Sequence, residues 1–128
     1  MISFDDFKKV EITVGKILSA EKIPDTDKLL KLSVDFGLKI ILIATEPSDG
    51  AVAPEPVREI RQIVSGISLY FPDPAVLVGK RCMFVTNLEP RVIKGYESNG
   101  MLFSVSTEDG KFSLLEPSAG IPEGTRAK

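Results

Sequence analysis

The sequence predicts an all-β fold: a small Greek-key barrel with short helices and an extended β-hairpin. Short apolar runs recur along the chain, and clusters of Gly, Pro, Asn and Asp separate them. One short helical segment is expected between the third and fourth runs. The chain has 128 residues, 43% of them hydrophobic and 27% charged, as is ordinary for a soluble protein. We therefore expect one domain over residues 1–128.

The first predicted elements are a helical turn and a strand. Ser3 is a candidate N-cap for a turn over residues 3–8, with an acidic residue three positions later. Apolar and polar residues alternate over residues 10–14, which indicates a strand that continues to Ala20. Gly15 interrupts the alternation, so we expect a bulge or a tight bend there. The strand ends at the turn Ile23-Pro24-Asp25.

The next region predicts a hairpin with a protruding tip. Leu29–Phe36 is a strand closed by a glycine, and Leu38–Ala44 is either its extension or a third strand. Thr45–Pro56 contains three prolines and a Ser-Asp-Gly turn, which indicates a surface loop. The period of Val57–Ser65 would also suit one face of a helix. Its β-branched residues and the glycine after it favour a strand.

The C-terminal half predicts shorter elements. Prolines break the stretch after residue 66 and leave room for one short helix. Apolar runs then predict two strands, and a Glu-Asp-Gly turn leads to another. The expected bounds are Pro74–Leu77 for the helix, and Arg81–Thr86, Gly100–Ser106 and Lys111–Leu115 for the strands.

The number of strands and the place of the helix best match the oligonucleotide/oligosaccharide-binding (OB) barrel. In that fold the ligand lies on the face of strands 2 and 3, between the loops that join strands 1–2 and 4–5. Here these loops are Lys22–Lys28 and Asn87–Asn99. The second loop is polar and carries Arg91 and Lys94 beside a sheet face, a common way to grip a phosphate backbone. The sequence thus predicts binding at this loop.

Residue types that support catalysis or metal binding are scarce. The chain has no His, which removes the usual general base and the commonest metal ligand. A single cysteine excludes zinc sites built on paired Cys or Cys/His and any internal disulfide. Asp25 and Asp27 could form a carboxylate pair, but Lys28 beside them favours a solvated turn. We expect no catalytic residue, no metal and no cofactor.

The sequence also favours a cytoplasmic location. The longest apolar stretch, Leu38–Ala44, contains a lysine and is too short to cross a bilayer. The first residues lack the apolar core of a secretory signal. Cys82 stands alone inside an apolar strand, which fits a reducing compartment and a buried position.

The charge pattern limits the kind of nucleic-acid binding that is expected. The net charge is −2 and the pI is about 5.2. Indiscriminate binding to polyanions depends on many Lys and Arg residues, so it is not expected here. A nucleic-acid function requires a local basic face instead. The expected face comprises Lys80, Arg81, Arg91 and Lys94, which have only Glu89 among them and Glu97 just beyond.

Five segments carry a resemblance to a known family: VEITVGKI (Val10–Ile17), PDTDKLLKLSVDFG (Pro24–Gly37), RQIVSGI (Arg61–Ile67), LVGKRCMFVTNLEPRVIKGYESNGMLF (Leu77–Phe103) and LEPSAGIPEGTRAK (Leu115–Lys128). In this order they resemble the tRNA-binding module of methionyl-tRNA synthetase C-terminal or β-subunit domains, which also occurs as free-standing structure-specific tRNA-binding proteins. They cover somewhat more than half of the chain. One such motif is weakly specific, whereas five in sequence are strong evidence.

The resemblance implies an OB barrel, a homodimer and recognition of tRNA by shape rather than sequence. It implies a noncatalytic accessory or β subunit that increases the tRNA affinity of methionyl-tRNA synthetase. Relatives turn back soon after the equivalent of Gly37, so residues 38–60 resemble an inserted hairpin arm. Carried onto matching positions, the expected RNA contacts are Asn87, Arg91, Lys94, Ser98 and Met101, with Lys28 and Ser65 of second rank.

Structural interpretations of the same residues stay open. Asn87 and Ser98 could cap the turn through local side-chain to backbone bonds. Met101 could serve core packing alone, and Lys28 could pair with a neighbouring aspartate. Tyr96 could stack on a base or be a packing residue.

Three departures and two other functions weigh against the leading hypothesis. Glu89 and Val92 stand where many relatives carry basic residues, and Ile23 replaces a common histidine, which lowers the affinity expected of one subunit. A secretion-type chaperone resembles the same module, so peptide binding is an alternative. A protein–protein adaptor that docks through the inserted arm is another.

Overall fold

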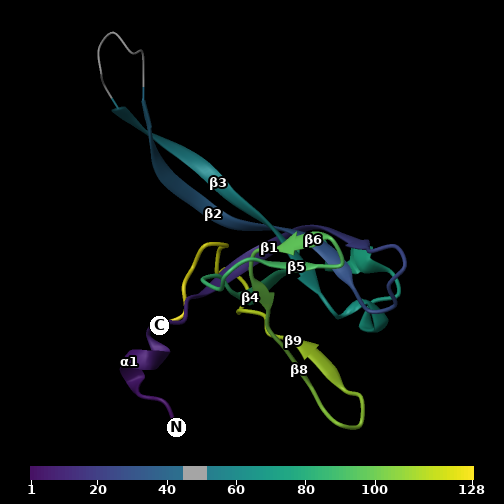
Figure 1. Cartoon of the computed structure of the whole chain (residues 1–128). Helices are drawn as coiled ribbons and strands as arrows, with labels where there is room; N and C mark the ends of the chain where they lie inside the picture. The colour runs from purple at the N-terminus through teal and green to yellow at the C-terminus, as the bar shows by residue number, and fades with distance from the viewer. Residues whose placement is uncertain (45–51) are drawn as a thin grey trace.

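The computed structural model describes the backbone of residues 1–44 and 52–128, and the side chains outside residues 41–54. A five-stranded antiparallel sheet in the order β3-β2-β1-β4-β7 curls around the core (Figure 1). The all-β OB-type fold predicted from the sequence is confirmed. Its strands are β1 (Ile12–Lys22), β2 (Leu30–Ala44), β3 (Val52–Ser65), β4 (Arg81–Val85) and β7 (Met101–Leu102).

Short elements complete the fold. A hairpin of β5 (Arg91–Ile93) and β6 (Tyr96–Ser98) lies between β4 and β7, and a ribbon of β8 (Ser104–Ser106) and β9 (Phe112–Leu114) follows. The helices are α1 (Phe4–Phe7), with the Ser3 hydroxyl accepting from Asp6 N, and the 3-10 helices η1 (Ser68–Tyr70) and η2 (Pro74–Leu77). Within the described residues, no helix is long and apolar enough to cross a membrane.

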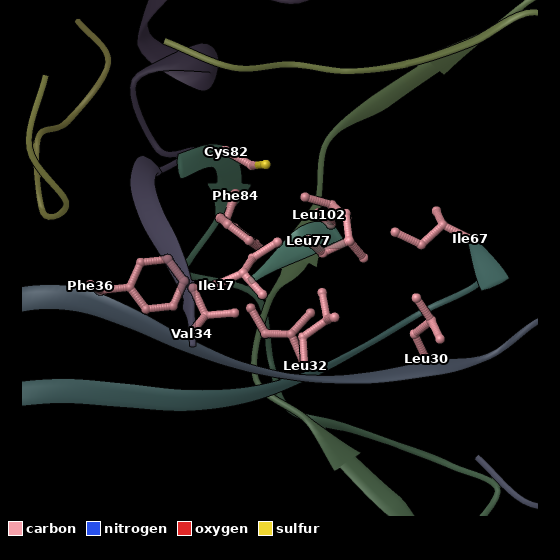
Figure 2. Packing of buried hydrophobic residues seen from close by; sticks show 11 residues of the cluster. Ile17, Leu30, Leu32, Val34, Phe36, Ile67, Leu77, Cys82, Phe84 and Leu102 are labelled. Atoms are coloured by element: carbon pink, nitrogen blue, oxygen red, sulfur yellow. The ribbon is translucent and has the colours of Figure 1, made fainter. Parts of the chain in front are cut away.

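The core fills the concave side of the sheet (Figure 2). Aliphatic side chains from β1, β2, β3 and β7 pack there with Leu77 of η2, and β4 contributes Cys82 and Phe84. The rings of Phe36 and Phe84 meet edge to face, with their centroids 5.3 Å apart. Cys82 is fully buried in this cluster, and burial raises the pKa of its thiol to about 11, so the thiol is neutral at pH 7.

The bulge expected at Gly15 is not found there. Pairing of β1 with β4 continues through Gly15, and the irregularity lies instead between Ile17 and Ser19, in the pairing with β2. Packing requires a glycine at position 15, because a Cβ atom there would lie 2.5 Å from Val34 Cγ1 and 2.7 Å from Phe36 Cε1. The glycine lets two core side chains lie against the β1 backbone.

Strands β2 and β3 continue past the barrel as a long two-stranded arm (Figure 1). Strand β2 passes through Gly37 with a register shift, so the segment over residues 38–44 extends the second strand. The surface loop predicted over residues 45–56 is wrong for Val52–Pro56, which belong to β3; residues 45–51 lie outside the described part. Two prolines are tolerated because β3 is an edge strand, where a missing N–H need not break a ladder.

Ion pairs fasten the base of the arm to the C-terminal segment. Arg58 on β3 reaches the buried Asp35 at 2.8 Å and Glu123 at 3.7 Å, and Arg81 reaches Glu123 at 2.9 Å. A backbone hydrogen bond and the Arg81 guanidinium hold the pKa of Glu123 below its ordinary value. The carboxylate therefore bridges β3 and β4.

Candidate functional site

The loop expected over Asn87–Asn99 contains a hairpin that the sequence did not indicate. Strands β5 and β6 pair Arg91 with Ser98 and Ile93 with Tyr96. Lys94 and Gly95 form the turn, with φ values of 52° and 85°. Two successive positive φ values are typical of a type I′ turn, whose twist matches that of the flanking strands. The hairpin therefore holds Lys94 at its tip.

Arg91 and Lys94 are exposed, and neither forms an ion pair with any residue that the structure describes. The four-cation face expected from the sequence is not found, because Lys80 and Arg81 lie at the opposite end of β4. There Lys80 pairs with Glu116 at 3.4 Å, and Arg81 pairs with Glu123. The hairpin thus carries two cations that form no described ion pair, although Glu97 stands on β6 opposite Val92.

A third cation approaches the hairpin from the sheet. Lys31 of β2 places its Nζ 5.5 Å from the centroid of the Tyr96 ring. The same ammonium lies 3.3 Å from Glu21, so its charge is partly offset. Tyr96 is half-buried under this contact, which favours the packing interpretation of its ring.

Ser98 and Asn87 have partners inside the fold. The Ser98 side chain is buried, and its hydroxyl accepts from Val64 N at 3.0 Å and donates to Gly100 O at 3.1 Å. Asn87 Oδ1 accepts from Glu11 N at 2.7 Å, which joins the end of β4 to the segment before β1. Both side chains hold distant segments together, and their contact with RNA stays a prediction.

The two second-rank residues, Ser65 and Lys28, differ in how they are placed relative to Ser98. Ser65 ends β3 and follows Val64, which bonds Ser98, while Lys28 O accepts from Ser68 N at 2.9 Å. Lys28 is exposed and forms no ion pair with Asp25 or Asp27. Ser65 therefore lies next to the residue that bonds Ser98, whereas the contact of either second-rank residue with RNA stays a prediction. Met101, opposite Val85 on β7, is 45% exposed and is not a core residue.

Sequence reasoning missed a pocket at the root of the hairpin. It has a volume of about 410 Å³ and lies between β3 and the chain on either side of the hairpin. Asn99 falls within the Ser-Asn-Gly-Met segment that the sequence already singled out, but its partners on β3 are more than thirty residues away. The residues that line the pocket are Ile60, Arg61, Gln62, Thr86, Leu88, Pro90 and Asn99.

Comparisons with known proteins place the chain in a family. Residues 56–126 match the family described as "Putative tRNA binding domain". A methionine–tRNA ligase from Methanospirillum hungatei is 42% identical over 127 residues, which are 99% of this chain and 16% of that protein. The chain thus spans about one sixth of the length of the curated relatives it matches.

Solved structures resemble the whole chain. A MetRS-related protein from Pyrococcus horikoshii is 38% identical, with a TM-score of 0.78, and the match covers 100% of this chain and 98% of that one. A CsaA chaperone from Picrophilus torridus is 25% identical, with a TM-score of 0.74, and the match covers both chains completely.

Proposed function

Because this chain belongs to the tRNA-binding domain family, we propose that it is a noncatalytic, structure-specific tRNA-binding protein whose β5–β6 hairpin meets the tRNA backbone. The observation that carries the proposal is the pair of exposed cations, Arg91 and Lys94, on a hairpin where no described acid pairs with them. Arg91 offers a planar fork to phosphate oxygens, and Lys94 offers a mobile point charge.

The distribution of charge favours recognition of a shaped RNA over capture of any polyanion. The chain has a net charge of −2, and many of its described cations are paired with acids. Few phosphates can therefore be neutralised at once, so nonspecific affinity should be low. A tRNA that presents its phosphates in the right arrangement would gain most from the hairpin.

We further propose that the protein is a homodimeric accessory subunit of a methionyl-tRNA synthetase in the cytoplasm. Support comes from the names of the curated relatives and of the Pyrococcus horikoshii structure. A tethered second contact raises the effective concentration of tRNA at the synthetase without new chemistry. Two copies of the hairpin would double the phosphate contacts, which suits an anionic subunit.

The test is a salt titration of tRNA binding to wild type and to Arg91→Ala with Lys94→Ala. Each neutralised phosphate contributes roughly 0.7–0.9 to the log–log slope. The double variant should bind more weakly and with a slope reduced by up to twice that amount. Lys8→Ala with Lys128→Ala is the matched control, because it removes two exposed charges that form no described ion pair, one directly after α1 and one at residue 128. Equal losses in both variants would refute the assignment to the hairpin.

The similarity to CsaA supports one other candidate, a peptide-binding chaperone. Competition separates the two functions. If the protein binds tRNA as proposed, an unfolded client peptide should not displace labelled tRNA. The peptide is added at concentrations that would saturate any peptide site on the protein. Displacement, or peptide binding without any tRNA binding, would favour the chaperone.

A further inference from the structure

The pocket at the root of the hairpin has the composition of a site for one flat, neutral, hydrogen-bonding group. We propose that it takes a single unpaired nucleobase of the bound RNA. This inference rests on the tRNA-binding function proposed above and adds a contact of a different kind. Its volume of about 410 Å³ falls within the range of roughly 300–1,000 Å³ that is typical of small-molecule pockets.

Apolar side chains form one part of the lining without serving the core. Ile60 is 50% exposed and Leu88 is 48% exposed, and Pro90 lies beside them. Large apolar side chains that are half exposed around a pocket form an apolar surface that a ligand can cover. A base removed from its stack has two π faces, and apolar side chains can contact them in place of neighbouring bases.

Amide groups supply the polar part. The side-chain amide of Asn99 has no hydrogen-bond partner among the described residues, although its backbone is fixed: Asn99 N donates to Gln62 O at 2.9 Å, and Asn99 O accepts from Arg61 at 3.1 Å. Gln62 Nε2 donates to Glu97 O at 3.0 Å, which leaves one hydrogen and its Oε1. Side-chain amides both donate and accept hydrogen bonds, as the edges of bases do. The Asn99 amide is held by a backbone that hydrogen bonds fix in place.

The charged residue in the lining, Arg61, is already paired with a carboxylate, which argues against a phosphate in this pocket. The Arg61 guanidinium lies 2.6 Å from Glu59 and donates to the carbonyls of Thr86 and Asn99. Partial burial alone would raise the pKa of Glu59, but hydrogen bonds from Lys39 and Arg61 outweigh it and hold that pKa below its ordinary value. The carboxylate therefore stays charged and continues to offset Arg61 at pH 7.

The chain also joins the two kinds of contact. Pro90 lines the pocket, and the next residue, Arg91, begins β5 with an exposed guanidinium. A nucleotide whose base enters the pocket would therefore have its phosphate near an unpaired cation. This arrangement separates the contact that reads a base from the contact that only positions the backbone.

The test compares Asn99→Ala and Leu88→Ala with wild type in tRNA titrations at several salt concentrations. Each variant should lose affinity roughly tenfold, the size expected when one hydrogen bond or one apolar contact to the base is removed, with an unchanged salt slope because no phosphate contact is lost. Val105→Ala, an exposed apolar truncation on β8, is the control and should bind as wild type does. Both pocket positions are partly exposed, so thermal unfolding should be unchanged.

A second measurement asks whether the group bound is unpaired. Wild type should prefer an RNA hairpin with an open loop over a blunt duplex with the same number of phosphates, and Asn99→Ala should lose that preference. Wild-type affinity in both pocket variants, or a reduced salt slope, would overturn the pocket while leaving tRNA binding intact. Failure of the wild-type protein to bind tRNA at all would instead remove the proposed function.

Discussion

A single buried hydroxyl fixes the candidate binding loop to the barrel. Ser98 is 4% exposed and supplies the acceptor for the backbone N–H of Val64, itself buried on β3. The family resemblance implies that Ser98 contacts RNA, whereas the geometry gives the same side chain a role in closing the barrel. The two roles predict different losses on substitution.

Ser98→Ala should destabilise the protein by about 1–3 kcal/mol, because Val64 N would be left buried without an acceptor. Urea denaturation monitored by circular dichroism measures this change. Ser113→Ala is the control, since that hydroxyl is exposed and bonds the neighbouring Leu114 carbonyl. Unchanged stability together with weaker tRNA binding would instead assign Ser98 to the RNA contact.

For single residues, the exposure of a side chain was easier to predict than its hydrogen-bond partners. Arg91 and Lys94 lie in a polar loop, and the structure leaves both exposed. The partners of Ser98 and Asn87 lie 34 and 76 residues away in sequence, so their long-range bonds could not be inferred from local capping patterns. Gln62 and Asn99 were missed for the same reason: the pocket exists only once β3 and the hairpin meet.

Among the elements, the arm is the one whose removal leaves the barrel complete. The buried cluster lies in the barrel, and the pairs that brace the base of the arm involve residues up to Lys39 and from Arg58 onward. Lys39 and Val57 are direct cross-strand partners. A two-residue turn can therefore join them without a change of register.

Replacing Ile40–Pro56 with Asn-Gly should preserve both the thermal unfolding transition and tRNA affinity. The variant keeps the described cations of the hairpin and the whole buried cluster. Thermal melts and tRNA titrations of the trimmed and full chains are the measurements. Loss of tRNA binding with an intact melt would place the arm in the RNA interface, and loss of a protein partner alone would support the adaptor alternative.

Long strands could be predicted from the pattern of apolar and polar residues, whereas the shortest strands could not. Strand β1 has eleven residues, and the alternation over residues 10–14 was enough to predict it. Strands β5 and β6 have three residues each and are joined by Lys94-Gly95, which is too little sequence for a period to show. Prolines predicted a loop at Val52–Pro56, but an edge strand has no obligatory use for every N–H.

For the whole molecule, the distribution of charge was predictable only in part. The sequence indicated that an anionic chain needs a local basic face to bind RNA. It could not indicate that Lys80 and Arg81 are paired with acids, because those acids lie 36 and 42 residues further along. Pairing across the fold reduces the face to the hairpin and at the same time ties the termini and the arm to the barrel.

This pairing makes the stability of the whole protein sensitive to acid. The pKa values of Glu59 and Glu123 are lowered in the folded state from an ordinary value of 4.5. A lowered pKa means that the unfolded chain binds more protons, so the stabilisation is fully present above pH 4.5 and is lost as the pH falls through the lowered values. Thermal unfolding from about pH 7 to about pH 3 should show this loss.

Replacing one of these carboxylates separates its contribution from that of other acids. Glu123→Gln should lower the melting temperature near pH 7, where the ion pair with Arg81 is lost, and have a smaller effect at pH 3. Glu108→Gln is the control, because Glu108 is exposed and forms no described ion pair. A Glu123→Gln curve parallel to that of wild type across the whole pH range would contradict the prediction. It would show that the charge of Glu123 does not account for the stabilising role of this position.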